Sequence, residues 1–289
     1  MNKKVIVTGG YGFIGSNLVD TLIDDGIEVI VIDNLATGNI NHHNEKAKYL
    51  VKDIRDDFSD YMHELEDSDA IIHLAGLARI QPSFENPTEF LSVNTQGTAN
   101  MCDLARKLNC KFVYAGSSSF YGGPDNSPYA FAKWQGEEVT RMYAKLFDLS
   151  ASVARFFNVF GPRHTTEGAY ATVVGVFQRQ YKNNESITIT WDGEQRRDFT
   201  HVNNIVRGLI KMSEGDWSGE TFNLGTANNY SINELADMFG KEYPKEYIPK
   251  RPGDARSTLA DLSFSKEHLG YEPIETLEKY MKEWMEENK

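Results

Sequence analysis

The sequence predicts an α/β protein, with a doubly wound parallel sheet followed by a smaller mixed α/β domain. Six short runs rich in β-branched residues alternate with segments of helical periodicity in the first half of the chain. A glycine-rich turn, TGGYGFIG, follows the first of these runs directly. Strands that alternate with helices pair in parallel, because each crossover helix carries the chain back to the same end of the sheet.

The expected strands are short and apolar, and the expected helices are longer and periodic. The strands are residues 3–8, 28–33, 48–52, 69–74, 111–115 and 151–156, and the helices are residues 13–24, 87–108 and 128–147. Runs such as EVIVID are apolar on both faces, which is typical of strands buried between helices. After residue 158 the pattern loosens into loops, a strand at 187–190 and helices at 202–213 and 274–286.

We expect two domains that pack tightly with a cleft between them. Residues 1–157 form the first domain, and the segment 199–223 returns to it. Residues 158–198 and 224–289 form the second domain. The chain has no internal repeat and no low-complexity tract that would mark a flexible linker.

Composition and charge narrow the class of protein. The 289 residues are 40% hydrophobic and 25% charged, as in ordinary globular proteins. The net charge of −12 argues against nucleic acid or an anionic membrane as a partner. Cys102 and Cys110 stand in no metal-ligand pattern, so we expect neither a metal nor a disulfide. The N-terminus does not resemble a signal peptide and no run approaches a membrane span, so we expect a cytoplasmic protein.

The glycine-rich turn predicts a dinucleotide site. Gly9, Gly12 and Gly15 lie between a strand and a helix, where glycines allow the backbone and the helix N-terminus to approach a pyrophosphate. Asp33 ends the second strand, where a carboxylate binds the ribose hydroxyls of NAD and repels the extra phosphate of NADP. The alternative for Asp33 is a turn residue. Asp53 follows the third strand, either facing the adenine amino group or lying solvated in its loop.

The stretch SSSFYGGPDNSPYAFAK, residues 117–133, predicts an acid–base site. Pro128 suits the first turn of a helix, so Tyr129 and Lys133 lie one turn apart on one helical face. A lysine ammonium beside a phenol stabilises the phenolate, which can then accept a proton from a substrate hydroxyl. Ser117 follows the fifth strand at the carboxyl edge of the sheet, where doubly wound folds bind ligands. The Tyr–Lys spacing alone is common by chance, and its context makes it specific.

With these motifs, nearly the whole chain resembles the extended short-chain dehydrogenase/reductase family, in its branch of NAD-dependent nucleotide-sugar epimerases and dehydratases. That branch has a Rossmann-like dinucleotide-binding domain and a smaller nucleotide-sugar-binding domain. Further matching motifs are HLAG at 73–76, SVNTQGT around Asn94, RFFNVFGPR at 155–163, GEQRRDFTHV at 193–202 and RPGD at 251–254.

The resemblance implies a role for each matching residue. Ser117, Tyr129 and Lys133 would be catalytic, with Tyr129 as the general base. The NAD-binding residues would be Gly9, Gly12, Phe13, Ile14, Gly15, Asp33, Asn34, Asp53, Ile54, Leu74, Ala75, Gly76, Asn94, Tyr129, Lys133 and Phe156. The substrate-binding residues would be Ser117, Ser118, Asn158, Thr172, Val173, Thr188, Arg197, Arg251 and Asp254, with the two arginines on the diphosphate. The alternatives are surface salt bridges for the arginines and a loop-stabilising role for Asn158.

Within the branch, the chain is most similar to UDP-glucose and UDP-N-acetylglucosamine 4-epimerases. The 4,6-dehydratases carry Asp-Glu after the catalytic hydroxyl, and the UDP-glucuronate decarboxylases carry Glu at the second position. Here these positions are Ser118 and Ser119. Thr258 is small, which leaves room for a 2-acetamido group. The alternatives are a decarboxylase, a 4-reductase or a dehydratase on the same scaffold, and an NAD-binding protein without catalysis.

Two departures from the family pattern lie in segments that affect the choice of substrate. Only residues 123–128 separate YG from Tyr129, so the loop beside the site is shortened. Trp191 replaces a usual glycine and either stacks on the uracil or fills a gap in the core.

Helices 87–108 and 128–147 resemble the pair that forms a homodimer interface in this family. The alternative is that the two helices simply pack on the sheet.

Overall fold

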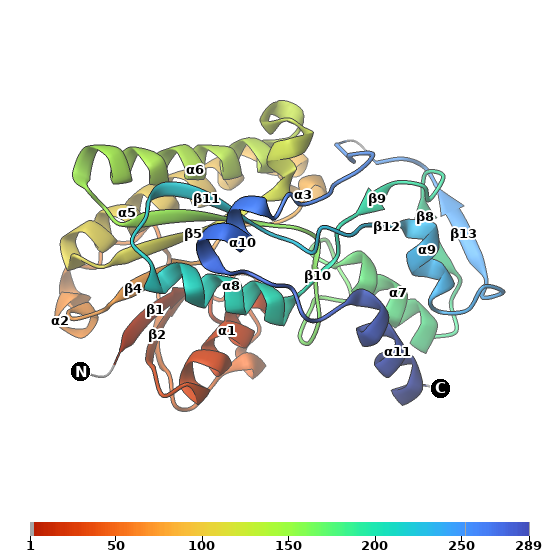
Figure 1. Ribbon diagram of the computed structural model, residues 1–289, viewed down its shortest axis with the longest axis horizontal. Coiled ribbons are helices and arrows are strands. Elements are labelled where there is room, and N and C mark those ends of the chain that lie inside the picture. Colours follow the sequence, from red (N-terminus) through yellow and green to blue (C-terminus); the bar gives the residue numbers. More distant parts are fainter. Residues whose placement is uncertain (1–2, 252, 289) are drawn as a thin grey trace.

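The computed structural model describes residues 3–251 and 253–288. Its centre is a seven-stranded sheet in the order β11-β6-β5-β4-β1-β2-β3, with every neighbouring pair parallel (Figure 1). The strands are β1 (Lys4–Thr8), β2 (Glu28–Asp33), β3 (Lys48–Val51), β4 (Ala70–His73), β5 (Lys111–Ser117), β6 (Ala151–Phe156) and β11 (Ser218–Leu224). The predicted Rossmann-like fold is confirmed. The chain changes direction between β1 and β4, where such sheets open a binding crevice.

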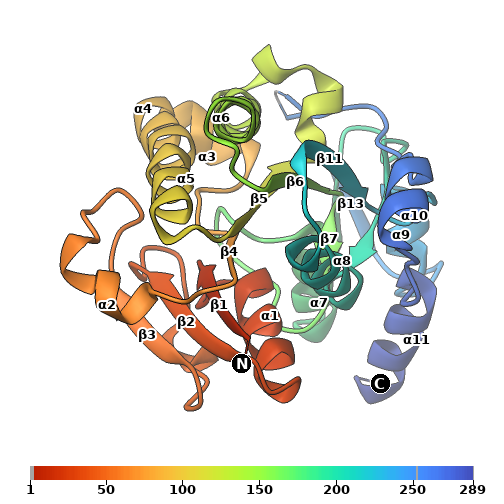
Figure 2. The same cartoon turned by 60° about the vertical axis from the view of Figure 1, so that its left-hand side comes forward.

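Helices cover both faces of the sheet, and the strand sequences explain how. Val5 and Val7 of β1 point into a core shared with α1 (Phe13–Asp24) and α8 (Val202–Glu214). Ile6, between them, points into the opposite core, under α5 (Gly97–Leu108) and α6 (Pro128–Phe147) (Figure 2). Successive side chains of a strand alternate between faces, so a strand covered on both sides is apolar at every position.

The predicted helix at 87–108 is interrupted. The structure has α4 (Pro87–Leu91), a π-helical segment at Ser92–Gln96, and then α5. Asn94 lies in the π-helical segment, and its amide holds the backbone of Leu77 from both sides: Oδ1 accepts from the Leu77 N–H at 2.8 Å and Nδ2 donates to its carbonyl at 2.9 Å. π-Helical turns are frequent at functional sites, and this one braces the loop after β4.

The remaining chain builds a second, smaller layer beside the carboxyl edge of the sheet (Figure 1). Its elements are β7 (Val159–Phe160), α7 (Val173–Lys182), β8 (Ile187–Thr190), β9 (Arg196–Arg197), β10 (Thr200–His201), β12 (Tyr230–Ser231), α9 (Ile232–Asp237), β13 (Lys245–Ile248) and α11 (Leu277–Glu287). They share a separate apolar core that includes Phe177, Phe239 and Met281. The shorter helices are α2 (Met62–Leu65), α3 (Ile80–Glu85) and α10 (Ser263–Leu269), the last packed on β11. The expected domain boundaries stay a prediction.

Candidate active site

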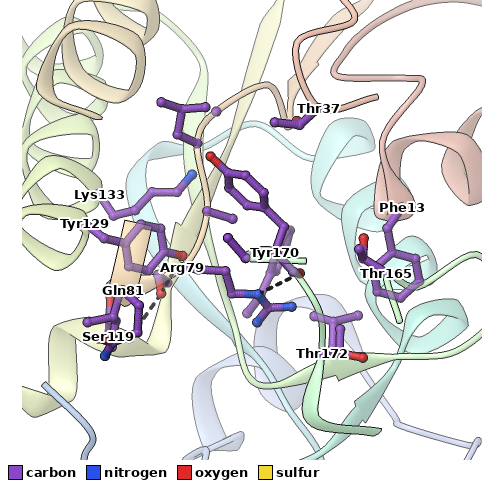
Figure 3. Close-up of a pocket in the computed structure, with 18 of the residues that line it drawn as sticks. Phe13, Thr37, Arg79, Gln81, Ser119, Tyr129, Lys133, Thr165, Tyr170 and Thr172 are labelled. Carbon is purple, nitrogen blue, oxygen red and sulfur yellow. Dashed lines mark hydrogen bonds between the residues drawn. The ribbon is translucent and has the colours of Figure 1, made fainter. Parts of the chain in front are cut away.

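A single large cavity of about 1110 Å³ opens at the carboxyl edge of the sheet. Its walls come from the ends of β1, β2, β4, β5 and β6 and from the loops and helices of the second layer. Every predicted site residue except Asn94 lines it. Asn94 instead lies behind the wall, where it holds the Leu77 backbone. Figure 3 shows part of this lining, with Tyr129 and Lys133 on one side and Thr172 on the other.

The glycine turn after β1 is shaped for a dinucleotide. Gly9 has a φ of +75°, and a Cβ there would lie 2.8 Å from the amide nitrogen of Ala75. A Cβ on Gly15 would overlap the carbonyl oxygen of Gly9, so only glycine lets α1 begin this close to β1. The first N–H groups of a helix have no partner within it, and the residues that carry them here, Gly12 to Gly15, line the cavity. This arrangement fits the pyrophosphate of NAD.

Two carboxylates follow β2 and β3 at the same edge. Asp33 is 7% exposed and accepts the backbone N–H groups of Tyr11 at 3.0 Å and Leu35 at 2.8 Å. Burial raises the pKa of Asp33, and these two bonds act against that rise. Asp53 pairs with Arg55 at 2.9 Å and accepts from Asn34 at 2.8 Å, which lowers its pKa to about 2. Neither carboxylate is a freely solvated loop residue.

The stretch that follows β5 brings the three expected catalytic side chains together. Ser127 caps α6 by accepting the N–H of Ala130 at 3.1 Å, which places Tyr129 in the first turn of the helix. The Tyr129 hydroxyl donates to Ser117 Oγ at 3.3 Å. One turn further on, Lys133 Nζ donates to the Ala115 carbonyl at 2.7 Å. A phenol, a hydroxyl and an amine thus converge at the end of β5.

The electrostatics of this group differ in one respect from the expectation. Burial raises the pKa of Tyr129, while its hydrogen bond with Ser117 and the charge of Arg79 lower it. Burial lowers the pKa of Lys133 to about 8, and the charge of Glu137 opposes that change. The charge that lowers the pKa of the Tyr129 phenol is that of Arg79, while the Lys133 amine donates to the Ala115 carbonyl.

Arg79 is the functional candidate that the sequence did not reveal. It lies in the loop after β4, with a φ of +81°, and its Nε donates to the carbonyl of Tyr170 at 3.1 Å. Figure 3 shows its guanidinium between Tyr129 and Thr172. A single arginine after an apolar strand carries no motif. Only its place next to the strand-end segment HLAG could have marked it as a residue at the ligand-binding edge.

The opposite wall gathers the residues expected to hold a nucleotide sugar. Asn158, Thr172, Val173, Thr188, Arg197, Arg251 and Asp254 come from five different segments and line the same cavity. Burial lowers the pKa of Arg197, and the charge of Asp254 counteracts it. Within residues 3–251 and 253–288, neither Arg197 nor Arg251 forms an ion pair, so the surface salt bridges considered above are not formed there. Pro252 of the RPGD motif lies outside the described residues.

Two residues singled out for the substrate lie in different places. Thr258 lines the cavity, and its buried hydroxyl oxygen has no hydrogen-bond partner among the described residues. Trp191 packs against two cations, with Lys250 Nζ at 4.2 Å and the Arg256 guanidinium carbon at 4.5 Å from its ring centre. The Trp191 ring therefore packs against cations and belongs to none of the three apolar clusters of the described residues.

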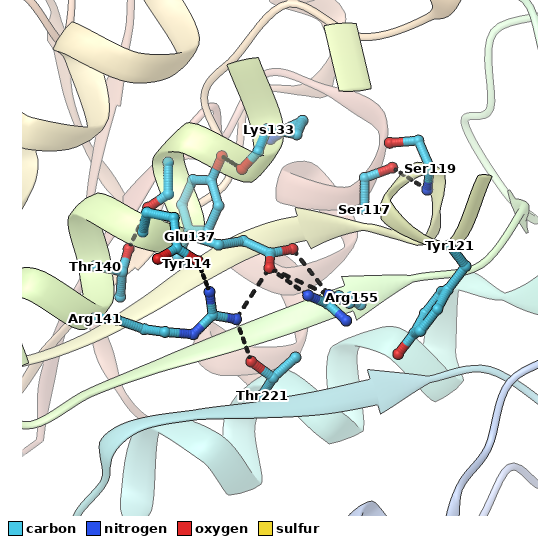
Figure 4. A network of polar contacts seen from close by, with 12 residues as sticks. Tyr114, Ser117, Ser119, Tyr121, Lys133, Glu137, Thr140, Arg141, Arg155 and Thr221 are labelled. Atoms are coloured by element: carbon cyan, nitrogen blue, oxygen red, sulfur yellow. Dashed lines mark hydrogen bonds and ion pairs between the residues drawn. The ribbon is translucent and has the colours of Figure 1, made fainter. Parts of the chain in front are cut away.

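A buried charge network supports the catalytic stretch from behind (Figure 4). Glu137 lies one turn after Lys133 on α6, and its side chain is 1% exposed. It accepts hydrogen bonds from Arg155 of β6 and from Arg141. The Arg155 guanidinium also stacks on the Phe120 ring at 3.6 Å, in the turn that follows Ser117. Helix α6, strand β6 and the serine turn are thereby tied together.

The described residues form neither a metal site nor a helix that could cross a membrane. In the part of the chain that the structure covers, no group of His, Cys, Asp and Glu side chains is arranged to hold a metal ion. Cys102 and Cys110 are buried free thiols. Among the described helices, none combines the length and apolar character that crossing a membrane requires.

Comparison with known proteins now defines the class. Residues 5–225 match the model of the NAD dependent epimerase/dehydratase family. The chain belongs to this family, and its cofactor is NAD.

The relatives of this chain include enzymes with different activities. A putative UDP-glucose 4-epimerase of Methanocaldococcus jannaschii is 34% identical, over 98% of this chain and 99% of that protein. The UDP-glucuronic acid decarboxylase 4 of Arabidopsis thaliana is 32% identical, over 93% of this chain and 65% of that protein. The crystal structure of the Thermotoga maritima UDP-glucose 4-epimerase with UDP-glucose has a TM-score of 0.91 and 32% identity, covering 98% of this chain and 97% of that one.

A dehydratase shares the fold as well. The dTDP-glucose 4,6-dehydratase of Streptomyces venezuelae has a TM-score of 0.87 and 25% identity, covering 99% of this chain and 97% of that one. Membership of the family therefore establishes a nucleotide-sugar enzyme scaffold and leaves the particular reaction to the residues of the site.

Proposed function

We propose that this protein is an NAD-dependent UDP-sugar 4-epimerase that acts through a transient 4-keto sugar. The observation that carries the proposal is the convergence of Ser117, Tyr129 and Lys133 on the cavity, followed by Ser118 and Ser119. Epimerisation at C4 requires only a base, a hydride acceptor and a sugar that can turn over. The serine hydroxyls at 118 and 119 are consistent with this reaction, because they add no further acid or base beside Tyr129.

Tyr129 is the proposed general base. In its phenolate form it accepts the proton of the sugar 4-hydroxyl and becomes the neutral phenol, and Ser117 orients the same substrate oxygen. Bound NAD supplies a hydride acceptor at its nicotinamide and the same hydride for return to the other face of the sugar. Lys133 donates to the Ala115 carbonyl and carries a positive charge in the same cavity below a pH of about 8.

The second layer is proposed to hold the nucleotide. Arg197 and Arg251 bind the diphosphate, since guanidinium forks match phosphate oxygens, and Asn158 donates to it from the end of β6. Asp254 binds the ribose. Anchoring the substrate by its diphosphate leaves the pyranose free to rotate. The sugar can then turn either face of C4 toward the nicotinamide, as epimerisation requires. UDP-glucose and UDP-galactose, or their 2-acetamido counterparts, are the proposed substrates, with Thr258 bordering the 2-substituent.

Three other reactions suit the same scaffold less well. A 4,6-dehydratase or a decarboxylase of this family needs an acidic side chain at position 118 or 119, and both are serine here. A 4-reductase would release an oxidised or reduced cofactor at every turnover. A binding protein without catalysis would have no use for the Tyr129–Lys133 pair.

The direct test is incubation of the purified protein with UDP-glucose, UDP-galactose, UDP-GlcNAc, UDP-GalNAc and UDP-glucuronate without added NAD. Proton NMR would report the C4 epimer through its H1 and H4 signals. We expect epimer from at least one sugar. Loss of carbon dioxide or water, or inertness toward all five sugars, would contradict the proposal.

We also propose a homodimer through α5 and α6. On the outer face of α6, Met142 and Leu146 are 42% and 64% exposed, and Phe147 at its end is 49% exposed. Apolar side chains grouped on one helix face favour a partner surface. Light scattering should give about twice the chain mass of 32.7 kDa, and substitution of Leu146 by Glu should return a monomer.

A further inference from the structure

Arg79 is a cation inside the catalytic cavity that lies near the proposed base and has no substrate contact assigned to it so far. It is half-buried, and the one hydrogen bond formed by its guanidinium runs from Nε to the Tyr170 carbonyl. The two terminal nitrogens have no hydrogen-bond partner, and no carboxylate pairs with them, among residues 3–251 and 253–288. Figure 3 shows these nitrogens turned into the open space between Tyr129 and Thr172.

The backbone holds this cation in place at a cost. Arg79 has a φ of +81°, in a region that L-residues other than glycine rarely occupy. Backbone strain of this kind persists where the surrounding structure over-determines it, often at ligand sites. Two anchors fix the segment, because Asn94 clamps Leu77 on one side and the Tyr170 carbonyl holds the Arg79 side chain on the other.

The side chains around Arg79 do not neutralise the charge of its guanidinium. The pKa of Tyr129 is raised, so the phenol facing Arg79 is neutral near pH 7. The proposed diphosphate already has Arg197 and Arg251 on the opposite wall. A desolvated guanidinium is costly without an anion, and its planar fork of N–H donors matches a carboxylate.

We propose that Arg79 is an anion site for the pyranose, so that the protein prefers a UDP-sugar with a carboxylate on its ring over a neutral one. This inference rests on the proposed function, since it places the sugar beside Tyr129. It refines the substrate class from UDP-hexoses in general to acidic UDP-sugars.

The test is a binding measurement, which does not depend on turnover. The NAD-loaded Tyr129→Phe protein stops the reaction, and isothermal titration near pH 7 gives Kd for UDP, UDP-glucose, UDP-glucuronate and UDP-N-acetylmuramate. The last two carry the carboxylate at C6 and on an O3 lactyl ether. We expect one or both to bind about 10- to 100-fold more tightly than UDP-glucose, as a charged bidentate contact allows.

Two substitutions on the same background separate the possible roles. Arg79→Gln should abolish the preference and leave Kd for UDP and UDP-glucose nearly unchanged, whereas Arg79→Lys should keep part of the preference. The inference is overturned if the parent protein shows no preference for either acidic sugar. It is also overturned if Arg79→Gln weakens UDP as much as the acidic sugars, because Arg79 would then bind the diphosphate.

The proposed reaction can fail independently. If Tyr129-intact protein yields no epimer from any acidic or neutral sugar, and the Arg79-dependent preference persists in the titrations, the 4-epimerase assignment falls and the anion site stands.

Discussion

Arg155 donates to both carboxylate oxygens of Glu137, from Nε at 3.0 Å and 3.2 Å and from Nη2 at 2.7 Å, and both side chains are buried. This pair joins β6 to α6 one turn beyond Lys133. Removing one partner of a buried ion pair leaves the other charge desolvated and unpaired. We therefore expect Glu137→Gln to lower the free energy of unfolding by about 3–5 kcal/mol.

Urea unfolding would measure this effect, with Glu138→Gln as the matched control. Glu138 also contacts Arg141 but is 52% exposed, so its loss should cost at most about 1 kcal/mol. Equal, small effects of the two substitutions would show that the buried pair does not support the fold of the site.

Tyr129→Phe should abolish catalysis without unfolding the protein. The substitution removes a hydroxyl whose one hydrogen bond within the described residues, to Ser117, is long at 3.3 Å. Loss of a general base lowers kcat by about 10²- to 10⁴-fold. Ser117→Ala should cost less, about 10- to 100-fold, because it removes one hydrogen bond to the substrate oxygen. Bound NAD, measured by absorbance after release, should be unchanged in both variants. A Tyr129→Phe protein with normal kcat would remove Tyr129 from the mechanism.

The pH dependence follows from the two opposed pKa shifts. The active form combines anionic Tyr129 with cationic Lys133, whereas burial raises the pKa of the first and lowers that of the second to about 8. Because the lysine titrates before the tyrosine, the population of the active form rises with pH until about 8 and then levels off.

A profile of kcat/KM against pH tests this order. The charge of Glu137 supports the lysine proton, so Glu137→Gln should move the break to lower pH. A wild-type profile that keeps rising well beyond pH 8 would mean that Lys133 retains its proton there.

Asp33 should control the choice between NAD and NADP. Its buried carboxylate ends β2 and would meet the 2′-phosphate of NADP directly. We expect Asp33→Ser to shift the ratio of the two affinities toward NADP by about 10- to 100-fold, measured by titration of cofactor-free protein. Asp53→Asn is the control, since Asp53 is paired with Arg55 and should leave the ratio unchanged. If only Asp53→Asn changed the ratio, the selectivity between NAD and NADP would come from the residue after β3, and the role proposed for Asp33 would be wrong.

The local parts of this structure could be predicted from the sequence. The bounds of β2, α1, α6 and β6 follow from apolar runs, a glycine turn and a proline at the helix start, all of which act within a few residues. The convergence of Tyr129 and Ser117 also followed, because both lie at the carboxyl edge of one sheet.

The non-local parts could not be predicted in the same way. Strand β11 has the sequence SGETFNL, which becomes a sheet strand only by pairing with β6, more than 60 residues earlier in the chain. The π-helical segment around Asn94 depends on the loop that it clamps. Arg79 acquires its role from Tyr170, which is 91 residues away, and from the phenol of a third segment.

The central claim is that Tyr129 acts as base while the hydrogen at C4 leaves and returns within the site. The most direct test is the reaction of the purified protein with its best UDP-sugar in D₂O, followed by proton NMR. The account predicts the C4 epimer with ordinary hydrogen retained at C4 and C5, because the hydrogen at C4 never enters the solvent. Deuterium at C4 or C5 of the product would contradict it, since it would require deprotonation of carbon rather than of the 4-hydroxyl.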